Sequence, residues 1–187
     1  MQDLNISLEF TPNPNTLKFL VNQVLLDRGA ANFTSADQTA KSPLAKRLFE
    51  IPGVMGVMIG TQFITITKSP TGDWDIIADE IPKAIENHLK QNLPIFDADF
   101  HTSQPSTSNP NETEVEKKIK EILDTEIRPA VAMDGGDIQF EKFEEGIVYL
   151  HLQGSCSSCP SSVATLKMGV ESRLKDAIPE VKEVVQI

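Results

Sequence analysis

Two segments near the start of the chain are predicted strands, and the first alternates apolar and polar residues, which is the pattern of a strand that buries one face. They cover residues 5–10 and 16–21, and the Pro/Asn-rich stretch between them predicts a hairpin turn. Further apolar runs at 54–59 and 62–68 predict a second strand pair. Apolar residues at helical spacing then begin after Asp73, and they are Trp74, Ile77, Ile81, Ile85 and Leu89.

Serine and proline positions set the expected helix ends in this half. Ser42 followed by Pro43 predicts the start of a short helix, because serine caps helices and proline fits the first helical position. Pro52 and Gly53 are expected to end that helix. Pro82 lies inside the later helical segment, so we expect a kink or a division there, since proline lacks an N–H and clashes with the preceding turn.

The second half has the predicted order helix, strand, strand, helix, strand. Thr113 and Glu116 form a capping-box pattern at the start of a helix of about four turns, which Pro129 is expected to stop. The remaining elements, in chain order, are strands at 138–143 and 147–152, a helix at 160–177 and a strand at 181–187.

Residues 101–112 separate the two halves. They are rich in Ser, Thr, Asn and Pro, and they cannot bury enough apolar surface to offset the entropy of ordering. We therefore expect a flexible linker at 101–112 between two small domains, at residues 1–100 and 113–187. The mixture of helices and strands predicts the α+β or α/β class.

Charge and hydropathy narrow the class of function. The chain has 17 basic and 27 acidic residues, and its longest basic cluster, at 117–120, lies among glutamates. We expect no nucleic-acid partner, because phosphate binding needs clustered Lys and Arg. No stretch approaches the ~20 apolar residues of a membrane span, and the start of the chain does not look like a signal or transit peptide. These features predict a cytoplasmic protein without a membrane partner. The bacterial cytosol is the first expectation and a mature mitochondrial matrix form is the alternative.

The candidate chemistry lies in Cys156 and Cys159, which are the two cysteines of the chain. They are expected between a strand and a helix, with Pro160 at the first helical position. Free backbone N–H groups and the helix dipole favour thiolate there, and thiolate is the form that binds iron or zinc. A two-residue spacer lets both sulfurs reach one metal or cluster. Ser157 and Ser158 can offer hydrogen bonds to the sulfurs.

A cysteine pair of this kind leaves several interpretations open. It can form part of an iron–sulfur site, act as a dithiol/disulfide oxidoreductase, staple a zinc-binding interaction module, or be two buried small hydrophobes. A closed iron–sulfur or zinc site takes four protein ligands, and His151 is expected on the outer face of its strand. Two copies of the chain, each giving Cys156 and Cys159, would supply the four ligands by symmetry. The protein would then be a homodimer when it is loaded with a cluster.

Several short motifs accompany the cysteine pair. In the second half they are Arg128-Pro129, Asp134-Gly135-Gly136-Asp137, 154–162 (GSCSSCPSS), 165–167 (TLK) and 178–181 (IPEV); in the first half they are 11–19 (TPNPNTLKF), 42–45 (SPLA), 51–54 (IPGV) and 63–66 (FITI). With these motifs, residues 114–187 resemble the C-terminal domain of NifU, the Nfu-type iron–sulfur scaffold and carrier family. Residues 3 to about 91 resemble the N-terminal domain found in many Nfu proteins.

The resemblance implies a carrier that receives an iron–sulfur cluster, typically 4Fe–4S with 2Fe–2S as the alternative. Its partners would be upstream cluster-assembly proteins and apo iron–sulfur proteins, and its cluster and metal ligands would be Cys156 and Cys159. We do not expect an enzyme, because the chain has no Walker-type phosphate loop and no nucleophile elbow. The N-terminal domain lacks cysteine, so we expect it to recognise partners or modulate delivery. For the loops at 134–137 and 11–16 we expect mainly backbone roles.

Overall fold

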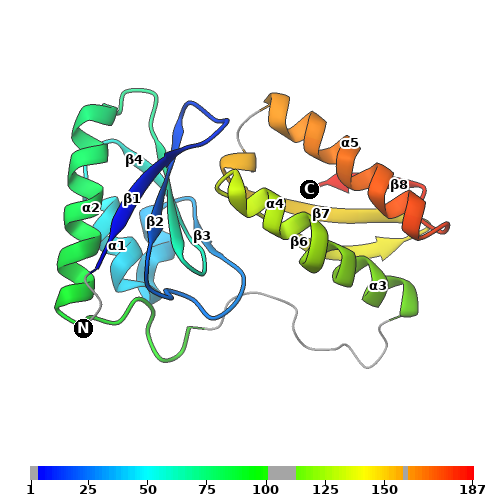
Figure 1. Cartoon of the computed structure of the whole chain (residues 1–187), viewed down its shortest axis with the longest axis horizontal. Helices are drawn as coiled ribbons and strands as arrows, with labels where there is room; N and C mark the ends of the chain where they lie inside the picture. The colour runs from blue at the N-terminus through cyan, green and yellow to red at the C-terminus, as the bar shows by residue number, and fades with distance from the viewer. Residues whose placement is uncertain (1–3, 101–112, 158–159) are drawn as a thin grey trace. The chain divides into compact units, whose positions relative to one another are not determined.

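The structure is a computed structural model that describes residues 4–100, 113–157 and 160–187. Each half of the chain combines helices with its own β-sheet, which confirms the predicted mixed fold class (Figure 1). Among the described residues, none of the helices has the length and apolar character needed to cross a bilayer.

The chain divides into two compact units, residues 1–103 and 104–187. The predicted linker at 101–112 lies outside the described residues. The domain limits 1–100 and 113–187 therefore stay predictions.

The N-terminal unit is built on a five-stranded antiparallel sheet with the strand order β1-β2-β5-β4-β3. Two hairpins and two helices were predicted, whereas the short strand and the 3-10 segment between them were not, because three to six residues are too few to set a period. The elements are β1 (Ile6–Phe10), β2 (Thr16–Val21), β3 (Ala31–Phe33), η1 (Ala36–Lys41), α1 (Pro43–Phe49), β4 (Val54–Ile59), β5 (Phe63–Lys68) and α2 (Trp74–Lys90).

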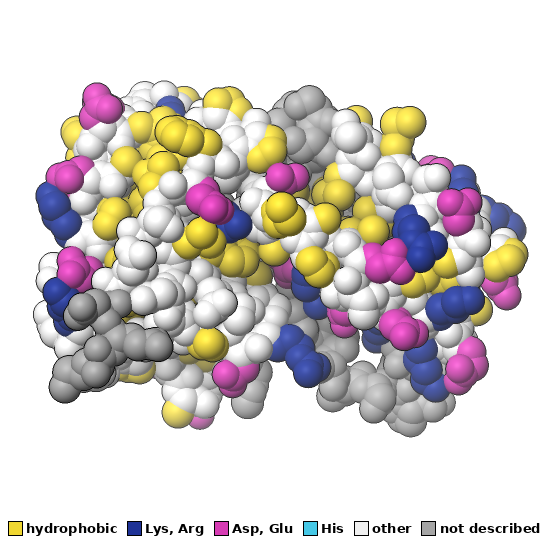
Figure 2. Space-filling view, viewed as in Figure 1, with side chains coloured by type: hydrophobic (Ala, Val, Ile, Leu, Met, Phe, Trp, Pro, Cys, Tyr) yellow, Lys and Arg dark blue, Asp and Glu magenta, His cyan; other side chains and the backbone are white. Residues whose placement is uncertain are grey.

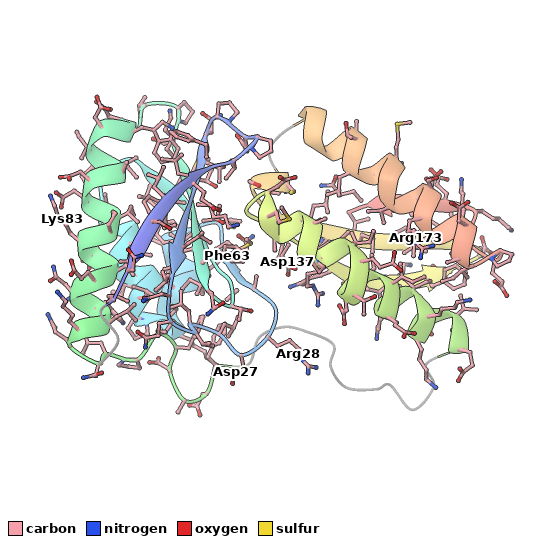
Figure 3. All side chains as sticks on the ribbon, in the orientation of Figure 1. Asp27, Arg28, Phe63, Lys83, Asp137 and Arg173 are labelled. Atoms are coloured by element: carbon pink, nitrogen blue, oxygen red, sulfur yellow. The ribbon has the colours of Figure 1, made fainter. Side chains whose placement is uncertain are left out.

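Both helices of this unit pack against one face of the sheet through a single apolar core. Phe19 of β2 is fully buried in this core, and so are Ile77, Ile81 and Ile85 on the inner side of α2. Lys83 points away from the sheet on the outer side of the same helix (Figure 3). The helical spacing found in the sequence is thus the spacing of the buried face.

The predicted helix starts are confirmed. Of the two alternatives expected at Pro82, a kink or a division, the division is wrong. Ser42 caps α1, because its hydroxyl accepts a hydrogen bond from the Ala45 N–H at 3.2 Å, and it also donates to the Ile95 carbonyl at 2.8 Å. Asp73 caps α2. That helix is continuous through Pro82, since the isoleucines on both sides of the proline are held against the sheet, and tertiary packing outweighs local propensity.

His88, near the end of α2, makes the stability of this unit depend on pH. Its ring is buried, Nε2 lies 3.0 Å from the Pro94 carbonyl, and Nδ1 has no hydrogen-bond partner among the described residues. Burial lowers the pKa of His88 from its usual 6.5, and the charge of Arg47 lowers it further. The unfolded chain therefore takes up this proton first as the pH falls.

We expect the free energy of unfolding of the N-terminal unit to decrease as the pH falls below about 6.5. The variant His88→Gln has no titratable side chain at position 88, so its free energy of unfolding should depend less on pH. Urea unfolding followed by the fluorescence of Trp74, the single tryptophan of the chain, measures this unit selectively. An equal loss of stability between pH 7 and pH 5 in both proteins would assign the effect to other groups.

The C-terminal unit has the predicted order of helix, strand, strand, helix and strand. Its three-stranded sheet has the order β6-β7-β8, with β6 antiparallel and β8 parallel to β7, so that α5 is the crossover between β7 and β8. The elements are α3 (Glu114–Ile122), the π-helical segment η2 (Leu123–Ile127), α4 (Arg128–Met133), β6 (Gly136–Glu144), β7 (Ile147–Gly154), η3 (Ser155–Ser157), α5 (Pro160–Ala177) and β8 (Glu183–Gln186).

The first helix of this unit begins as predicted, but α3 ends at Ile122, and helical structure continues past Pro129 to Met133. Thr113 and Glu116 form the capping box. The chain then passes through η2, where the Arg128 N–H donates to the Leu123 carbonyl five residues back. Pro129 consequently falls in the first turn of α4, where its missing N–H breaks no helical bond.

Helices α3 and α5 cover the apolar face of the sheet (Figure 1). Val148 and Leu150 of β7 point into this core, as the alternation of the strand predicted. The buried residues on the helical side are Ile119 and Ile122 of α3, Leu123 of η2, and Val170 and Leu174 of α5.

Candidate functional site

The candidate site begins where β7 ends. Gly154 turns the chain with a φ of 65°, the short segment η3 carries Cys156, and α5 starts at Pro160 as predicted. Cys156 is buried, with 3% of its surface exposed. Cys159 lies outside the described residues, so its part in the site stays a prediction.

Close contact with Gly136 sets the position of the Cys156 sulfur. A Cβ atom on Gly136 would lie 2.5 Å from Cys156 Sγ and 3.0 Å from the Gln153 carbonyl oxygen, which is closer than real side chains approach. Only glycine therefore leaves room for the sulfur at the start of β6. The preceding Gly135 makes the turn with a φ of 76°, so each glycine of the motif meets a separate backbone requirement.

Ser155 ties the cysteine segment to the loop at 134–137. Its hydroxyl donates to the Asp134 carbonyl, its N–H donates to the Gly135 carbonyl at 3.2 Å, and its Oγ lies 3.8 Å from Cys156 Sγ. Ser157 was expected to donate a hydrogen bond to a cysteine sulfur, but its hydroxyl donates to the Gly154 carbonyl at 2.8 Å. The serine beside the sulfur is therefore the one before Cys156, and Ser158 is outside the described residues.

A largely buried ion pair between Arg128 and Asp137 lies at the end of the loop at 134–137. Asp137, expected in a turn, lies in β6 with its side chain buried, and Arg128 Nε is 3.0 Å from Asp137 Oδ1. Arg128 Nη1 lies 2.6 Å from Asp124 Oδ1. Arg128 Nη2 donates a hydrogen bond to the Ile138 carbonyl at 3.0 Å. Burial raises the pKa of Asp137 above its usual 3.8, and the charge of Arg128 opposes that rise.

Replacing Arg128 by Met should destabilise the C-terminal unit by about 3–5 kcal/mol at pH 7, because Asp137 would remain as a buried charge without a cation. The loss should shrink at acid pH, where protonation removes that charge. Asp124→Asn is the matched control, since it removes only the more exposed partner of the same arginine and should cost about 0–1 kcal/mol. Amide hydrogen exchange of β6 and β7 measures the stability of both variants. An equal loss of stability in Arg128→Met and Asp124→Asn would contradict the expectation that the buried partner matters more.

A groove lies between η2 and α4 on one side and α5 on the other, with a volume of about 650 Å³. Cys156 is among its lining residues, together with small or apolar side chains of both walls. Glu126 and Arg173 join the walls through a two-pronged ion pair, at 2.6 and 2.7 Å, and Arg173 lies on α5 (Figure 3). Hydrophobic side chains gather over the region between α4 and α5, while charged ones gather toward the end of α5 (Figure 2).

Two other sequence features take structural roles. His151 is partly exposed on the outer side of β7, as predicted, and its Nε2 lies 3.7 Å from Glu141. The loop at 11–16 is held by its own hydrogen bonds, since the Thr11 hydroxyl donates to the carbonyls of Asn13 and Thr16. The indole of Trp74 donates to the Pro14 carbonyl at 3.1 Å, which links this turn to the start of α2.

The fold and the site define a small two-unit protein with a cysteine segment between a strand and a helix. The family model of the NifU-like domain matches residues 119–185, and that of the scaffold protein Nfu/NifU N terminal matches residues 6–92. The chain is 45% identical over 186 residues to the "NFU1 iron-sulfur cluster scaffold homolog, mitochondrial" of Drosophila grimshawi. It is 42% identical over 183 residues to the human protein of the same description. The chain therefore belongs to the NFU1 iron–sulfur cluster scaffold homologue family.

These alignments cover 97% of this chain, 61% of the Drosophila grimshawi protein and 71% of the human one. The chain thus spans less than two thirds of the length of the fly relative. Both relatives are labelled mitochondrial, which gives no support to the expected bacterial cytosol. Among solved structures, the solution structure of a NifU-like protein from Saccharomyces cerevisiae is 29% identical, covers 51% of this chain and 89% of its own, and has a TM-score of 0.45.

Proposed function

We propose that this protein is an iron–sulfur cluster scaffold and carrier, which holds a cluster between the cysteine pairs of two copies and passes it to apo-proteins. The observation that carries the proposal is the buried Cys156 of η3, between β7 and α5 and within the residues that match the NifU-like domain, and the sequence has Cys159 three residues further on. The name of its relatives, iron–sulfur cluster scaffold homologues, supports the same role.

The number of ligands supports the shared site. An iron–sulfur cluster takes four thiolates, and this chain supplies two cysteines. Two copies related by a twofold axis supply four, with Cys156 and Cys159 of each chain in equivalent positions. A cluster at a boundary between two chains is held by few bonds from each, which suits release to another protein.

The surroundings of Cys156 support thiolate binding. The sulfur is held against Gly136, and the segment that follows leads into the first turn of α5, where backbone N–H groups and the helix dipole favour negative charge. We propose 4Fe–4S as the cargo, with 2Fe–2S as the alternative. The recipients would be apo iron–sulfur proteins, the donors would be upstream cluster-assembly proteins, and a reducing compartment would keep the thiols available.

Anaerobic reconstitution of the full chain with ferrous iron and sulfide tests this function. We expect a brown protein with about one cluster per two chains and the mass of a homodimer in solution. Absorption and Mössbauer spectra would then distinguish 4Fe–4S from 2Fe–2S. Full occupancy in a single chain without an external thiol would contradict the shared site. Stoichiometric zinc without iron uptake would instead favour the interaction module, and a colourless monomer that reduces disulfides would favour the oxidoreductase.

We also propose that residues 113–187 bind the cluster, that residues 1–100 recognise partners or modulate delivery, and that 101–112 is the linker. The absence of cysteine from the first half of the sequence supports this division. A chain shortened to residues 113–187 is expected to load the same amount of iron per chain as the full protein and to transfer it at a different rate. A shortened chain that folds but takes up no iron would show that both halves are needed for binding.

A further inference from the structure

Gly169 occupies a position in α5 where the chain itself has no need of glycine. It lies in the interior of an 18-residue helix, where glycine is less favourable than alanine because it loses more backbone freedom on folding. A Cβ atom built there would meet no atom of the described residues within 4 Å. Neither a close neighbour among the described residues nor a positive φ therefore accounts for the missing side chain.

The position of Gly169 suggests what does account for it. Gly169 of α5 and Ala130 of α4 both line the same groove as Cys156. Met168 directly precedes Gly169 on α5, and Met133 follows Ala130 by about one helical turn. Both methionines are more than 70% exposed. The groove that Cys156 lines thus has small residues on both walls, and each wall helix also carries an exposed methionine close in sequence to them, so another backbone can approach closely.

We propose that the groove between α4 and α5 is the surface on which a second copy of this chain packs, and that Gly169 is its point of close approach. This inference rests on the proposed function. Since each chain brings two cysteines and Cys156 lines the groove, the chain that completes the cluster must bring its own cysteines to this surface. A closed twofold pair then uses the same groove on both copies, so each contact is made twice.

The test places a side chain at Gly169 in the full-length protein. Leucine at this position fills open space in the single chain but occupies the proposed contact, so Gly169→Leu should fold normally by circular dichroism and thermal melting. After anaerobic reconstitution, its dimer mass should be lost and its iron content per chain should fall about tenfold. Glu121→Leu is the control, because it adds the same side chain to an exposed position of α3 outside the groove. It should load and dimerise like the unmodified chain.

A second variant gives the same test without filling the groove. Met168→Glu adds a charge to a side chain that is 74% exposed, so folding is not at risk, and in a twofold pair the charge is present on both copies. Dimer mass and iron content should again fall, and the loss should be smaller at high salt.

The possible outcomes separate this inference from the function on which it rests. If the unmodified chain loads a cluster as a dimer and both variants do the same, the groove is not the contact surface and the inference is overturned. If the variants load and dimerise normally but transfer the cluster to an apo-protein more slowly, the groove receives the recipient protein instead, which also overturns it. If the unmodified chain binds no cluster, the proposed function fails and this inference fails with it.

Discussion

Replacing either Cys156 or Cys159 by serine is expected to abolish stable cluster binding. A serine hydroxyl does not ionise in water at neutral pH, so it cannot replace a thiolate, and a symmetric pair of variant chains would lose two of four ligands at once. Loss of a residue that only orients a metal ligand costs about 10–100-fold in affinity, and loss of the ligand itself should exceed that. Iron and sulfide content after anaerobic reconstitution and desalting measures the effect.

Ser157→Ala is the matched control for the cysteine variants, because it changes the same segment without removing sulfur and its hydroxyl donates only to the Gly154 carbonyl in the described structure. It should retain cluster binding at a level close to that of the unmodified chain. The fold of all three variants should stay intact by circular dichroism. A cysteine variant that retained a full cluster would refute the ligand assignment.

Gly136→Ala is expected to reduce stability and cluster binding together. The added methyl group would lie 2.5 Å from Cys156 Sγ and 3.0 Å from the Gln153 carbonyl, so either the sulfur or the strand must move. Overpacking of this kind costs about 1–3 kcal/mol, which we expect to see as faster amide exchange in β6 and β7. Iron uptake should fall in parallel, because the displaced sulfur no longer occupies the position set by the loop.

For stability, Gly169→Ala is the matched control of Gly136→Ala, since it is the same change at a site with no atom of the described residues within 4 Å. Its free energy of unfolding should rise by about 0.5–1 kcal/mol, because alanine is the better helix former. If both variants lowered stability equally, contact with the cysteine would not be the cause at Gly136. Unchanged iron uptake in Gly136→Ala would show that the sulfur can move without affecting the site.

The differences between prediction and structure in the helices have a common physical reason. Pro82 and Pro129 were expected to interrupt helices, because proline removes a hydrogen-bond donor and crowds the turn before it. The structure keeps the chain helical at both residues. At Pro82 the apolar stripe of α2 is anchored to the sheet on both sides, and before Pro129 a π-helical segment shifts the hydrogen-bond pattern. Neither the sheet contact nor the π-helical segment can be recognised from local spacing.

The supports of the cysteine segment were also missed or only partly understood from the sequence. The glycines at 135 and 136 were expected to serve the backbone, but their spacing does not reveal that one makes a turn and the other makes room for a sulfur 20 residues later. Asp137 was placed in a turn, whereas it is buried beside Arg128. Such pairs are formed by residues far apart in the chain or on different elements, so no local period records them.

The sequence by itself determined the mixed fold class, the order of elements in each half, the caps at Ser42 and Thr113, and the place of the cysteine segment between a strand and a helix. These features follow from short-range periodicity and from side chains that satisfy the backbone groups at helix ends. Only the tertiary structure decided that Gly136 contacts Cys156, that Arg128 meets Asp137, and that Gly169 lies open in a groove beside the cysteine. Contacts of this kind depend on how the helices and the sheet pack, because the free energy of close packing belongs to the assembled unit and not to any one segment.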